Sequence, residues 1–240
     1  HDKPVSYHEF ALEGKSPAIT QTRELLGRFA NTEEPVLIYG ENGTGKEAAA
    51  SFIHNHSTRR LKPLVVVNCA ALPISLTQNE LFGHEKGAFT HAMSSRKGRI
   101  ETADGGTLLL VGIDELKLEQ QSAILRFLQE GQIERIGGCH PIKVDVRVIA
   151  TSTTPLDQLV TQGHFRSDVI YRLGSLNVLL PPLRARKEDI PELANRILAA
   201  APSSVEPKRL TEVTTICLAE HPWPGNLREL QNRLRQALLL

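Results

Sequence analysis

Five short runs of apolar residues alternate with segments of helical periodicity along the first three quarters of the chain. The runs cover residues 36–39, 64–68, 107–113, 144–150 and 176–180. Near-continuous apolar strands that alternate with helices are typical of a parallel sheet covered on both faces. The pattern therefore predicts an α/β fold.

Two of the helices have clear signals. The first begins with Ser16 as N-cap and Pro17 at the first helical position, and it carries Ile19, Leu26 and Phe29 inward. The second follows the third apolar run, where helical spacing relates Leu118, Gln121, Ile124, Leu125 and Leu128.

Pro181 and Pro182 end this pattern, because proline donates no backbone hydrogen bond to a sheet and restricts the residue before it. Only helical signals follow, over residues 189–200, 211–220 and from Asn226 onward. We expect an α/β domain of residues 1–182 and a helical domain of residues 183–240.

The composition is that of an ordinary globular protein. The 240 residues are 40% hydrophobic and 23% charged, with a formal net charge of +1, which argues against bulk electrostatic binding of nucleic acid. Three scattered cysteines are typical of reduced thiols, and no Cys/His cluster has metal-ligand spacing. No apolar run approaches the roughly 18 residues of a membrane span, and no signal peptide is recognisable. We expect a cytoplasmic protein without a membrane partner.

The candidate chemistry lies in a glycine-rich loop between the first apolar run and a helix predicted over residues 48–53. The loop consists of Gly40, Glu41, Asn42, Gly43, Thr44, Gly45, Lys46 and Glu47. In this context backbone N–H groups and a helix N-terminus converge on an anion, and Lys46 is placed to reach terminal phosphates as a point charge. The loop predicts binding of a nucleotide.

This loop and four further motifs resemble a single family. Residues 40–47 (GENGTGKE) are similar to its GESGTGKE, and residues 80–90 (ELFGHEKGAFT) to the segment leading into its GAFTGA loop. Residues 165–173, 182–190 and 223–230 resemble its FREDLYYRL, PLRERxEDI and WPGNVREL. The family is the AAA+ central domain of bacterial enhancer-binding proteins, the NtrC-like activators of sigma-54 RNA polymerase. The resemblance implies a five-stranded parallel sheet between helices, followed by a C-terminal helical lid.

The resemblance also implies roles for individual residues. Arg166 and Arg172 match arginines that are offered to the nucleotide of a neighbouring subunit, and Arg228 matches the sensor arginine of the lid. Asn68 matches the residue that switches the catalytic glutamate between its resting and active positions. The loop expected to contact sigma-54 contains Phe89, Thr90 and His91.

The chain departs from the family where hydrolysis needs two carboxylates. The family sequence GGTLFLDEIGEL aligns without a gap to residues 105–116, and its Asp and Glu fall on Val111 and Gly112. Asp114 and Glu115 lie three residues further along, and a shift of about 10 Å along a strand is incompatible with Mg²⁺ contacts near 2 Å. Because loss of a general base typically costs about 10²–10⁴-fold, we expect hydrolysis to be weak or absent.

Two milder departures concern the sigma-54 loop and the sensor strand. His91 stands where the family has glycine, whose backbone adopts conformations that a β-carbon disfavours. Thr151, Ser152 and Thr153 stand where the family usually has Ala-Thr-Asn. The parts used for nucleotide binding and assembly are retained.

We therefore expect the central domain of a bacterial transcription regulator that binds ATP or ADP and uses it to set assembly into a ring or dimer, with Mg²⁺ held by no protein carboxylate. The turnover-deficient branch of the family includes VpsR-like activators of biofilm genes. The expected partners are RNA polymerase holoenzyme and, through a helix-turn-helix domain outside these residues, promoter DNA; an N-terminal regulatory domain is also implied. An alternative is a working ATPase that remodels sigma-54 RNA polymerase and recruits Asp114 or Glu115.

A third alternative is a response to cyclic di-GMP, which some family members bind. In the FleQ-like branch a Leu-Phe-Arg-Ser segment before the phosphate loop and a later Arg-Asn pair serve this ligand. Here the equivalent positions are residues 8–11 (HEFA) and Ser51-Phe52. The arginines of that binding mode are therefore missing, and binding at another surface stays open.

Overall fold

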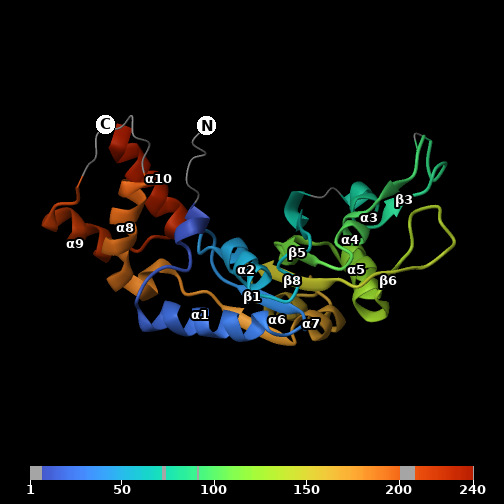
Figure 1. Ribbon diagram of the computed structural model, residues 1–240, viewed down its shortest axis with the longest axis horizontal. Coiled ribbons are helices and arrows are strands. Elements are labelled where there is room, and N and C mark those ends of the chain that lie inside the picture. The colour runs from blue at the N-terminus through green and yellow to red at the C-terminus, as the bar shows by residue number, and fades with distance from the viewer. Residues whose placement is uncertain (1–6, 72–73, 91, 201–208, 240) are drawn as a thin grey trace. The chain divides into compact units, whose positions relative to one another are not determined.

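The computed structural model describes residues 7–71, 74–90, 92–200 and 209–239 (Figure 1). The chain divides into two compact units, which are described separately. The lid-and-loop unit comprises residues 1–27, 40–49 and 179–240, and the sheet unit comprises residues 28–39 and 50–178. The phosphate loop thus groups with the C-terminal helices, and the expected division at residue 182 stays a prediction.

A five-stranded sheet in the order β2-β5-β8-β1-β9 forms the centre of the sheet unit. Its strands are β1 (Val36–Tyr39), β2 (Leu64–Asn68), β5 (Thr107–Val111), β8 (Arg147–Ser152) and β9 (Leu176–Leu179). Because β2, β5, β8 and β1 run parallel, their C-terminal ends lie at one edge, where Val111 is opposite both Asn68 and Thr151. The predicted parallel sheet between helices is confirmed.

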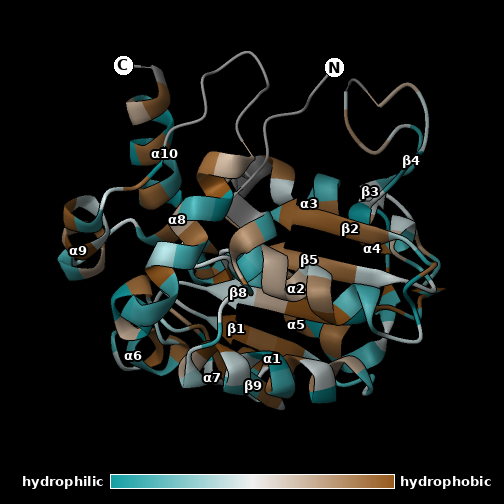
Figure 2. Ribbon diagram, turned by 60° about the vertical axis from the view of Figure 1, so that its left-hand side comes forward, coloured by the Kyte–Doolittle hydropathy of each residue, from teal (hydrophilic) through white to brown (hydrophobic). Residues whose placement is uncertain are grey.

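Both faces of the central strands are buried. Leu108 and Leu110 of β5 join the core formed with neighbouring helices, and Leu109 and Ile149 on the opposite face are also buried. Figure 2 shows the predominantly hydrophobic colour of β1, β2 and β5. The helices of this unit are α3 (Ile74–Phe82), α4 (Arg99–Thr102), α5 (Leu118–Glu130), α6 (Leu156–Thr161) and α7 (Ser167–Leu173), and a 3-10 turn, η2 (Cys69–Ala71), follows β2.

Helices α1 (Pro17–Ala30) and α2 (Lys46–Asn55) each include residues of both units. Helix α1 begins at the predicted residue, and its predicted inward residues Ile19, Leu26 and Phe29 are all buried. Helix α2 begins at Lys46, directly after the last glycine of the loop, and is therefore longer than the predicted span of residues 48–53.

The prediction for the end of the third strand was wrong. Strand β5 ends at Val111 rather than at Ile113, because Gly112 adopts the left-handed conformation with φ 70° and ψ 52°. Residues Ile113–Glu115 then form a 3-10 turn, η3. The acidic residues Asp114 and Glu115 consequently lie in a turn and not on the strand.

The bounds of the fourth strand were also predicted wrongly, since residues 147–152 are extended instead of residues 144–150. Thr151 and Ser152 are fully buried in β8. Their hydroxyl groups bond to the Gly112 N–H and to the Thr154 carbonyl oxygen. Because both hydroxyls have partners, these polar side chains continue the strand.

Two small hairpins had no signal in the sequence. One pairs β3 (Gly83–His84) with β4 (Arg96–Lys97), and the other pairs β6 (Gln132–Ile133) with β7 (Ile142–Lys143). A bridge between His84 and Ile136 joins them. The hairpin β3–β4 carries the loop of residues 85–95, which contains the predicted sigma-54 contacts.

The lid-and-loop unit has its own core. Its elements are η1 (Tyr7–Phe10), η4 (Leu183–Asp189), α8 (Ile190–Ala199), α9 (Glu212–Glu220) and α10 (Asn226–Leu239). Phe10 and Ala11 pack with Leu193, Trp223 and Leu227 among other buried residues of this unit. The three helices after the proline pair are confirmed, with ends within two residues of those predicted.

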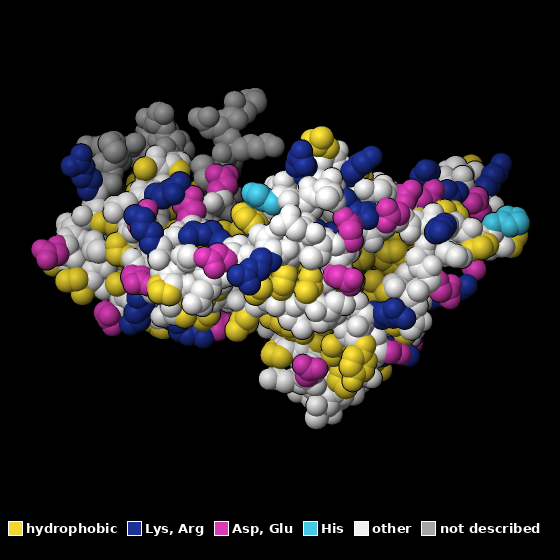
Figure 3. Space-filling model, turned by 60° about the horizontal axis from the view of Figure 1, so that its bottom comes forward, with side chains coloured by type: hydrophobic (Ala, Val, Ile, Leu, Met, Phe, Trp, Pro, Cys, Tyr) yellow, Lys and Arg dark blue, Asp and Glu magenta, His cyan; other side chains and the backbone are white. Residues whose placement is uncertain are grey.

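The surface carries mixed charge, in agreement with the net charge of +1. Figure 3 shows basic and acidic side chains interspersed over one face of the molecule. The three cysteines are free, and burial raises the pKa of Cys69 to about 12. In the part of the chain that the structure describes, no helix combines the length and apolar character that membrane crossing requires.

A buried histidine joins α2 to the N-terminal end of β5. Nδ1 of His54 lies 2.9 Å from the Thr107 hydroxyl oxygen. Burial lowers the pKa of His54, and the nearby positive charge of Arg147 lowers it further, against an opposing hydrogen bond with the backbone of Lys62 that raises it. The folded protein therefore favours neutral His54.

This lowered pKa predicts a pH-dependent stability. Below the unfolded histidine pKa of about 6.5, the unfolded chain binds a proton that folded His54 does not, so the free energy of unfolding falls as the pH decreases. We expect His54→Gln to reduce this fall between about pH 7.5 and 5.5 in urea unfolding. The exposed His56 provides the matched control His56→Gln; equal pH dependence in the wild type and both variants would contradict the prediction.

Candidate nucleotide site

The phosphate loop of residues 40–45 turns tightly between β1 and α2. Gly43 and Gly45 have φ values of 78° and 98°, which side chains disfavour. A β-carbon on Gly43 would collide with the carbonyl oxygen of Gly225, and one on Gly45 would collide with Ala11. A glycine loop that opens a helix offers backbone N–H groups and a helix N-terminus to phosphate. The loop therefore fits a nucleotide phosphate chain.

The Lys46 ammonium lies over the loop. Its Nζ donates to the carbonyl oxygens of Gly40 at 2.5 Å and Glu41 at 3.1 Å. The Thr44 hydroxyl and N–H also donate to Glu41 O, at 2.8 and 3.3 Å. When a nucleotide binds, the Lys46 ammonium can release these carbonyl oxygens and donate to phosphate oxygens instead, as a phosphate-binding lysine does.

Two residues of the helical segment after Pro182 hold Glu41, and together these three residues are here called the loop clamp. Arg184 donates from Nη2 and Nη1 to the two carboxylate oxygens of Glu41, at 2.5 and 2.8 Å. Asn226 donates from Nδ2 to Glu41 Oε2 at 3.2 Å and to Asn42 O at 2.9 Å, while its Oδ1 accepts from Leu183 N–H at 2.8 Å. The Arg184 hydrogen bond is the largest cause that lowers the pKa of Glu41 to about 2.

The first turn of α10 also contacts the phosphate loop. The N–H of Leu227 donates to Gly43 O at 3.1 Å. Arg228 is exposed, and its Cβ would lie 3.1 Å from a β-carbon built on Gly43. The structure therefore brings the predicted sensor arginine beside the predicted phosphate loop.

Two buried charged residues of η4 fix the segment before α1. Asp189 accepts from Ser16 N–H at 2.9 Å and from the Ser16 hydroxyl at 2.5 Å. Arg186 donates to the Ala11 carbonyl oxygen at 3.0 Å, and burial lowers its pKa to about 10. Because Ala11 lies against Gly45, these contacts hold this segment beside the phosphate loop.

The end of β5 in the sheet unit carries no carboxylate. Val111 is its last residue and lies opposite Asn68 and Thr151. Gly112, at the predicted position of the catalytic glutamate, has no side chain and starts the η3 turn. Among the residues that the structure describes, no group of three or more His, Cys, Asp or Glu could hold a metal.

Asp114 contacts the end of β8. Its Oδ2 accepts from the N–H groups of Thr153 at 3.1 Å and Thr154 at 3.0 Å. Its Oδ1 is buried without a hydrogen bond, and the neighbouring Glu115 is exposed. Asp114 thus binds two protein amides through one of its carboxylate oxygens.

The remaining predicted nucleotide-site residues lie at the surface of the sheet unit. Asn68 is exposed at the end of β2, and its Oδ1 accepts from Ala70 N–H at 3.1 Å. Arg166 directly precedes α7 and pairs with both carboxylate oxygens of Asp168, at 2.7 and 3.0 Å. Arg172 is exposed in the last turn of the same helix. Both arginines are accessible to another molecule.

The predicted sigma-54 loop folds back on its own base. The rings of Phe89 and His84 lie 4.9 Å apart, although Phe89 remains 45% exposed. Ala92 N–H donates to Phe89 O at 2.9 Å. Thr90 is exposed, and His91 lies outside the residues that the structure describes.

The second hairpin is tied to the base of this loop. Arg135 donates to Glu85 at 2.8 Å and to Glu101 at 2.7 Å. The backbone of Ile136 exchanges hydrogen bonds with Gly83 and Glu85, both at 2.9 Å. The two loops therefore share one structural base.

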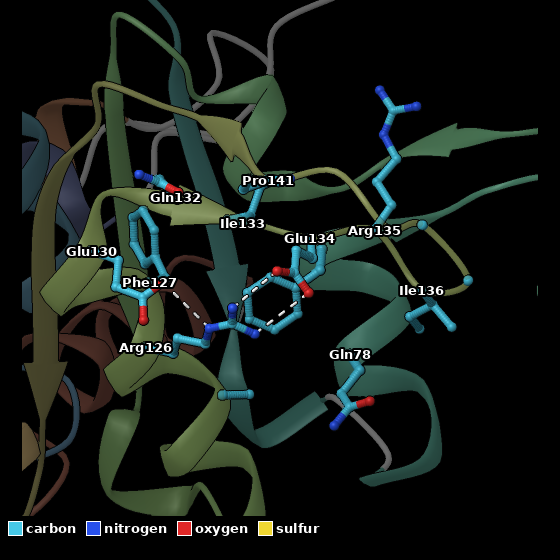
Figure 4. Close-up of a pocket in the computed structure, with 14 residues that line it drawn as sticks. Gln78, Arg126, Phe127, Glu130, Gln132, Ile133, Glu134, Arg135, Ile136 and Pro141 are labelled. Atoms are coloured by element: carbon cyan, nitrogen blue, oxygen red, sulfur yellow. Dashed lines mark hydrogen bonds and ion pairs between the residues drawn. The ribbon is translucent and has the colours of Figure 1, made fainter.

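A cavity of about 420 Å³ opens between α5 and the hairpin β6–β7 (Figure 4). Phe127 and Ile133 contribute buried apolar surface, and Arg126 bonds to Glu130 and Glu134 across it. None of its lining residues was predicted as a site residue. The cavity is thus separate in sequence from the phosphate loop.

Four residues that organise the phosphate loop had no predicted role. Arg184, Arg186, Asp189 and Asn226 all lie within the motifs of residues 182–190 and 223–230. Their contacts join residues far apart along the chain, for example Asn226 with Glu41, 185 positions away. Their positions within the motifs could have marked these residues as functional. Their hydrogen-bond partners could be recognised only from the folded structure.

Comparison with known proteins gives one consistent result. The family model described as "Sigma-54 interaction domain" matches residues 12–179, and the model described as "AAA+ ATPase lid domain" matches residues 184–240. The chain is 46% identical over 234 residues to "DNA-binding transcriptional regulator NtrC" of Klebsiella pneumoniae, covering 97% of this chain and 50% of the relative. It is 47% identical over 240 residues to a "Nif-specific regulatory protein" of Klebsiella oxytoca, covering 98% and 46%.

Solved structures agree with these relatives. NtrX from Brucella abortus in complex with ATP has a TM-score of 0.88 and 36% sequence identity, covering 95% of this chain and 52% of that chain. The complex of the same protein with ADP has a TM-score of 0.87. The AAA+ fold is therefore established, and the chain spans about half the length of the relatives it matches.

The loop clamp makes Asn226 important for stability. Asn226→Ala removes the bonds to Leu183, Asn42 and Glu41 and places alanine at φ 53°. Leaving a buried N–H group unpaired costs about 1–3 kcal/mol, so we expect the free energy of unfolding in urea to fall by that order. Asn177→Ala, at an exposed residue with one bond to Gly174, should change it by less than about 0.5 kcal/mol; equal losses would refute this role.

Proposed function

Because this chain belongs to the family of sigma-54 interaction domains with an AAA+ lid, we propose that it is the central nucleotide-binding domain of a bacterial sigma-54-dependent transcription activator. The observation that carries this proposal is the phosphate loop, with Lys46 over it and Glu41 held by Arg184 and Asn226. The match of residues 12–179 to the family supports the same function.

The ligand of this loop is ATP or ADP. NtrX from Brucella abortus, with 36% identity, was crystallised with each of these nucleotides. The glycine conformations at Gly43 and Gly45 and the start of α2 at Lys46 support a phosphate chain at the corresponding place. Arg228, beside Gly43, supports a lid that responds to the bound nucleotide.

The proposed partners follow from the family. They are sigma-54 RNA polymerase, further copies of this chain in a ring or dimer, and promoter DNA through a domain outside these residues. The accessible Arg166 and Arg172 support a contact with a neighbouring copy, and the exposed Phe89 and Thr90 support a contact with sigma-54. The relatives named above are regulators of the NtrC and Nif types; they give no support to a biofilm role or to cyclic di-GMP. A cytoplasmic location is part of the same proposal.

Two forms of this function differ in turnover. The relatives favour the predicted alternative, a working ATPase that remodels sigma-54 RNA polymerase. Val111 and Gly112 at the end of β5 favour binding with weak or no hydrolysis, because neither supplies a carboxylate. A working ATPase would have to use Asp114 Oδ1, the carboxylate oxygen that makes no hydrogen bond.

Nucleotide binding is tested by calorimetry with ATP and Mg²⁺. We expect a measurable dissociation constant for the wild type and a loss of about 10- to 100-fold for Lys46→Ala, because a cation that pairs with phosphate contributes about 1.5–3 kcal/mol. Lys143→Ala, at an exposed residue of β7, is the matched control. No binding by the wild type, or equal binding by Lys46→Ala, would overturn the assignment of this loop.

Phosphate release by the same proteins separates the two forms. Without the carboxylate pair we expect turnover below about 0.01 s⁻¹, at least 10²-fold under the lower end of ordinary enzyme rates of about 1 s⁻¹. Release near 1 s⁻¹ that is abolished in Asp114→Ala/Glu115→Ala would establish the working ATPase. Phosphate release that persists in Lys46→Ala would instead reveal a contaminating ATPase. The release rate would then be measured again on protein purified free of that contaminant.

A further inference from the structure

Three of the positions at which this chain departs from its family lie together in the sheet unit. Gly112, Asp114 and Thr151 stand where the family has Glu, Gly and Ala. Residues of β5 and of β8 lie directly opposite each other there, with Val111 paired to Thr151. The three changed residues are therefore neighbours in space and not scattered losses.

The first contact joins the backbone after β5 to a side chain of β8. The Gly112 N–H donates to the Thr151 hydroxyl oxygen at 3.1 Å. Thr151 is completely buried, and alanine at its place would offer no acceptor. Gly112 has φ 70° and ψ 52°, a conformation that glycine adopts readily and glutamate does not.

The second contact runs in the opposite direction, from a side chain after β5 to the backbone after β8. Asp114 Oδ2 accepts from Thr153 N–H at 3.1 Å and from Thr154 N–H at 3.0 Å. The Ser152 hydroxyl donates to the Thr154 carbonyl oxygen at 2.5 Å. Glycine at position 114 would leave both amides without this acceptor.

We propose that these contacts form a hydrogen-bonded cap in which Asp114 is the positioning residue, so that the strand ends are held in one fixed arrangement where the family carries its acidic pair. The cap consists of Gly112, Asp114, Thr151 and Ser152 with the amides of residues 153 and 154. It rests on the proposed function for its relation to turnover. If the cap is present, placing Asp and Glu at positions 111 and 112 is not enough to restore hydrolysis.

Hydrogen exchange of the full chain tests the cap without any nucleotide. We expect Asp114→Ala to accelerate exchange of the Thr153 and Thr154 amides by at least 10-fold, because each loses its acceptor. Asp114→Asn keeps a carbonyl oxygen and should retain most of the protection. Glu115→Ala removes the adjacent exposed carboxylate and should change nothing. Unchanged exchange in Asp114→Ala, with the fold intact by circular dichroism, overturns the proposal.

Phosphate release then tests the link to turnover. Val111→Asp/Gly112→Glu alone should stay within about 3-fold of the wild type. The same pair combined with Asp114→Gly and Thr151→Ala should exceed it by at least 10-fold, since both contacts that hold Gly112 and the β8 end are removed. Equal recovery by the double and the fourfold variant contradicts the cap as an obstacle to hydrolysis.

Calorimetry on the same variants keeps the two proposals apart. If the wild type binds no ATP while Asp114→Ala still accelerates the two amides, the proposed function fails and the cap stands. If ATP binds with Lys46-dependent affinity while exchange is unaffected by Asp114→Ala, the cap fails and the proposed function stands.

Discussion

The parallel register of four strands is the constraint from which the chemistry of the sheet unit follows. Because β2, β5, β8 and β1 run in one direction, their last residues meet at one edge of the sheet. This alignment sets Val111 between Asn68 and Thr151, so the last side chain of β5 at this edge is an apolar one. A residue after the strand can act there only through the turn that follows, and Asp114 uses that turn to bind two amides of the neighbouring strand end.

The lid-and-loop unit is held together in a different way, by buried polar side chains that each form a hydrogen bond with a backbone group. Asn226, Asp189 and Arg186 all have backbone partners in segments distant along the chain. Buried polar groups of this kind stabilise only the arrangement in which they are satisfied. They therefore give a glycine-rich loop, which has little side-chain packing of its own, a defined relation to the helices of its unit.

Much of the fold was predictable because its strands are buried on both faces and appear as continuous apolar runs. The beginnings of β1, β2 and α1 follow from Val36, Leu64 and Pro17 alone. The end of β5 was not predictable, since the left-handed turn at Gly112 is accompanied by a hydrogen bond to Thr151, 39 positions away. The hairpins β3–β4 and β6–β7 were missed because strands of two residues leave no periodic pattern. At the candidate nucleotide site the sequence predicted roles for the loop and Arg228, which the structure places side by side, whereas the partners of Glu41 required tertiary structure.

The pairing of Glu41 with Arg184 also determines which changes of solution the phosphate loop can register. With a pKa of about 2, Glu41 stays ionised at any pH that a living cell reaches. The pair is partly exposed, with 46% and 41% of the two side chains accessible, so dissolved ions screen it. The ion pair between Arg184 and Glu41 is therefore insensitive to mild acidification but weakens as ionic strength rises, so the surrounding salt concentration affects how firmly the phosphate loop is held.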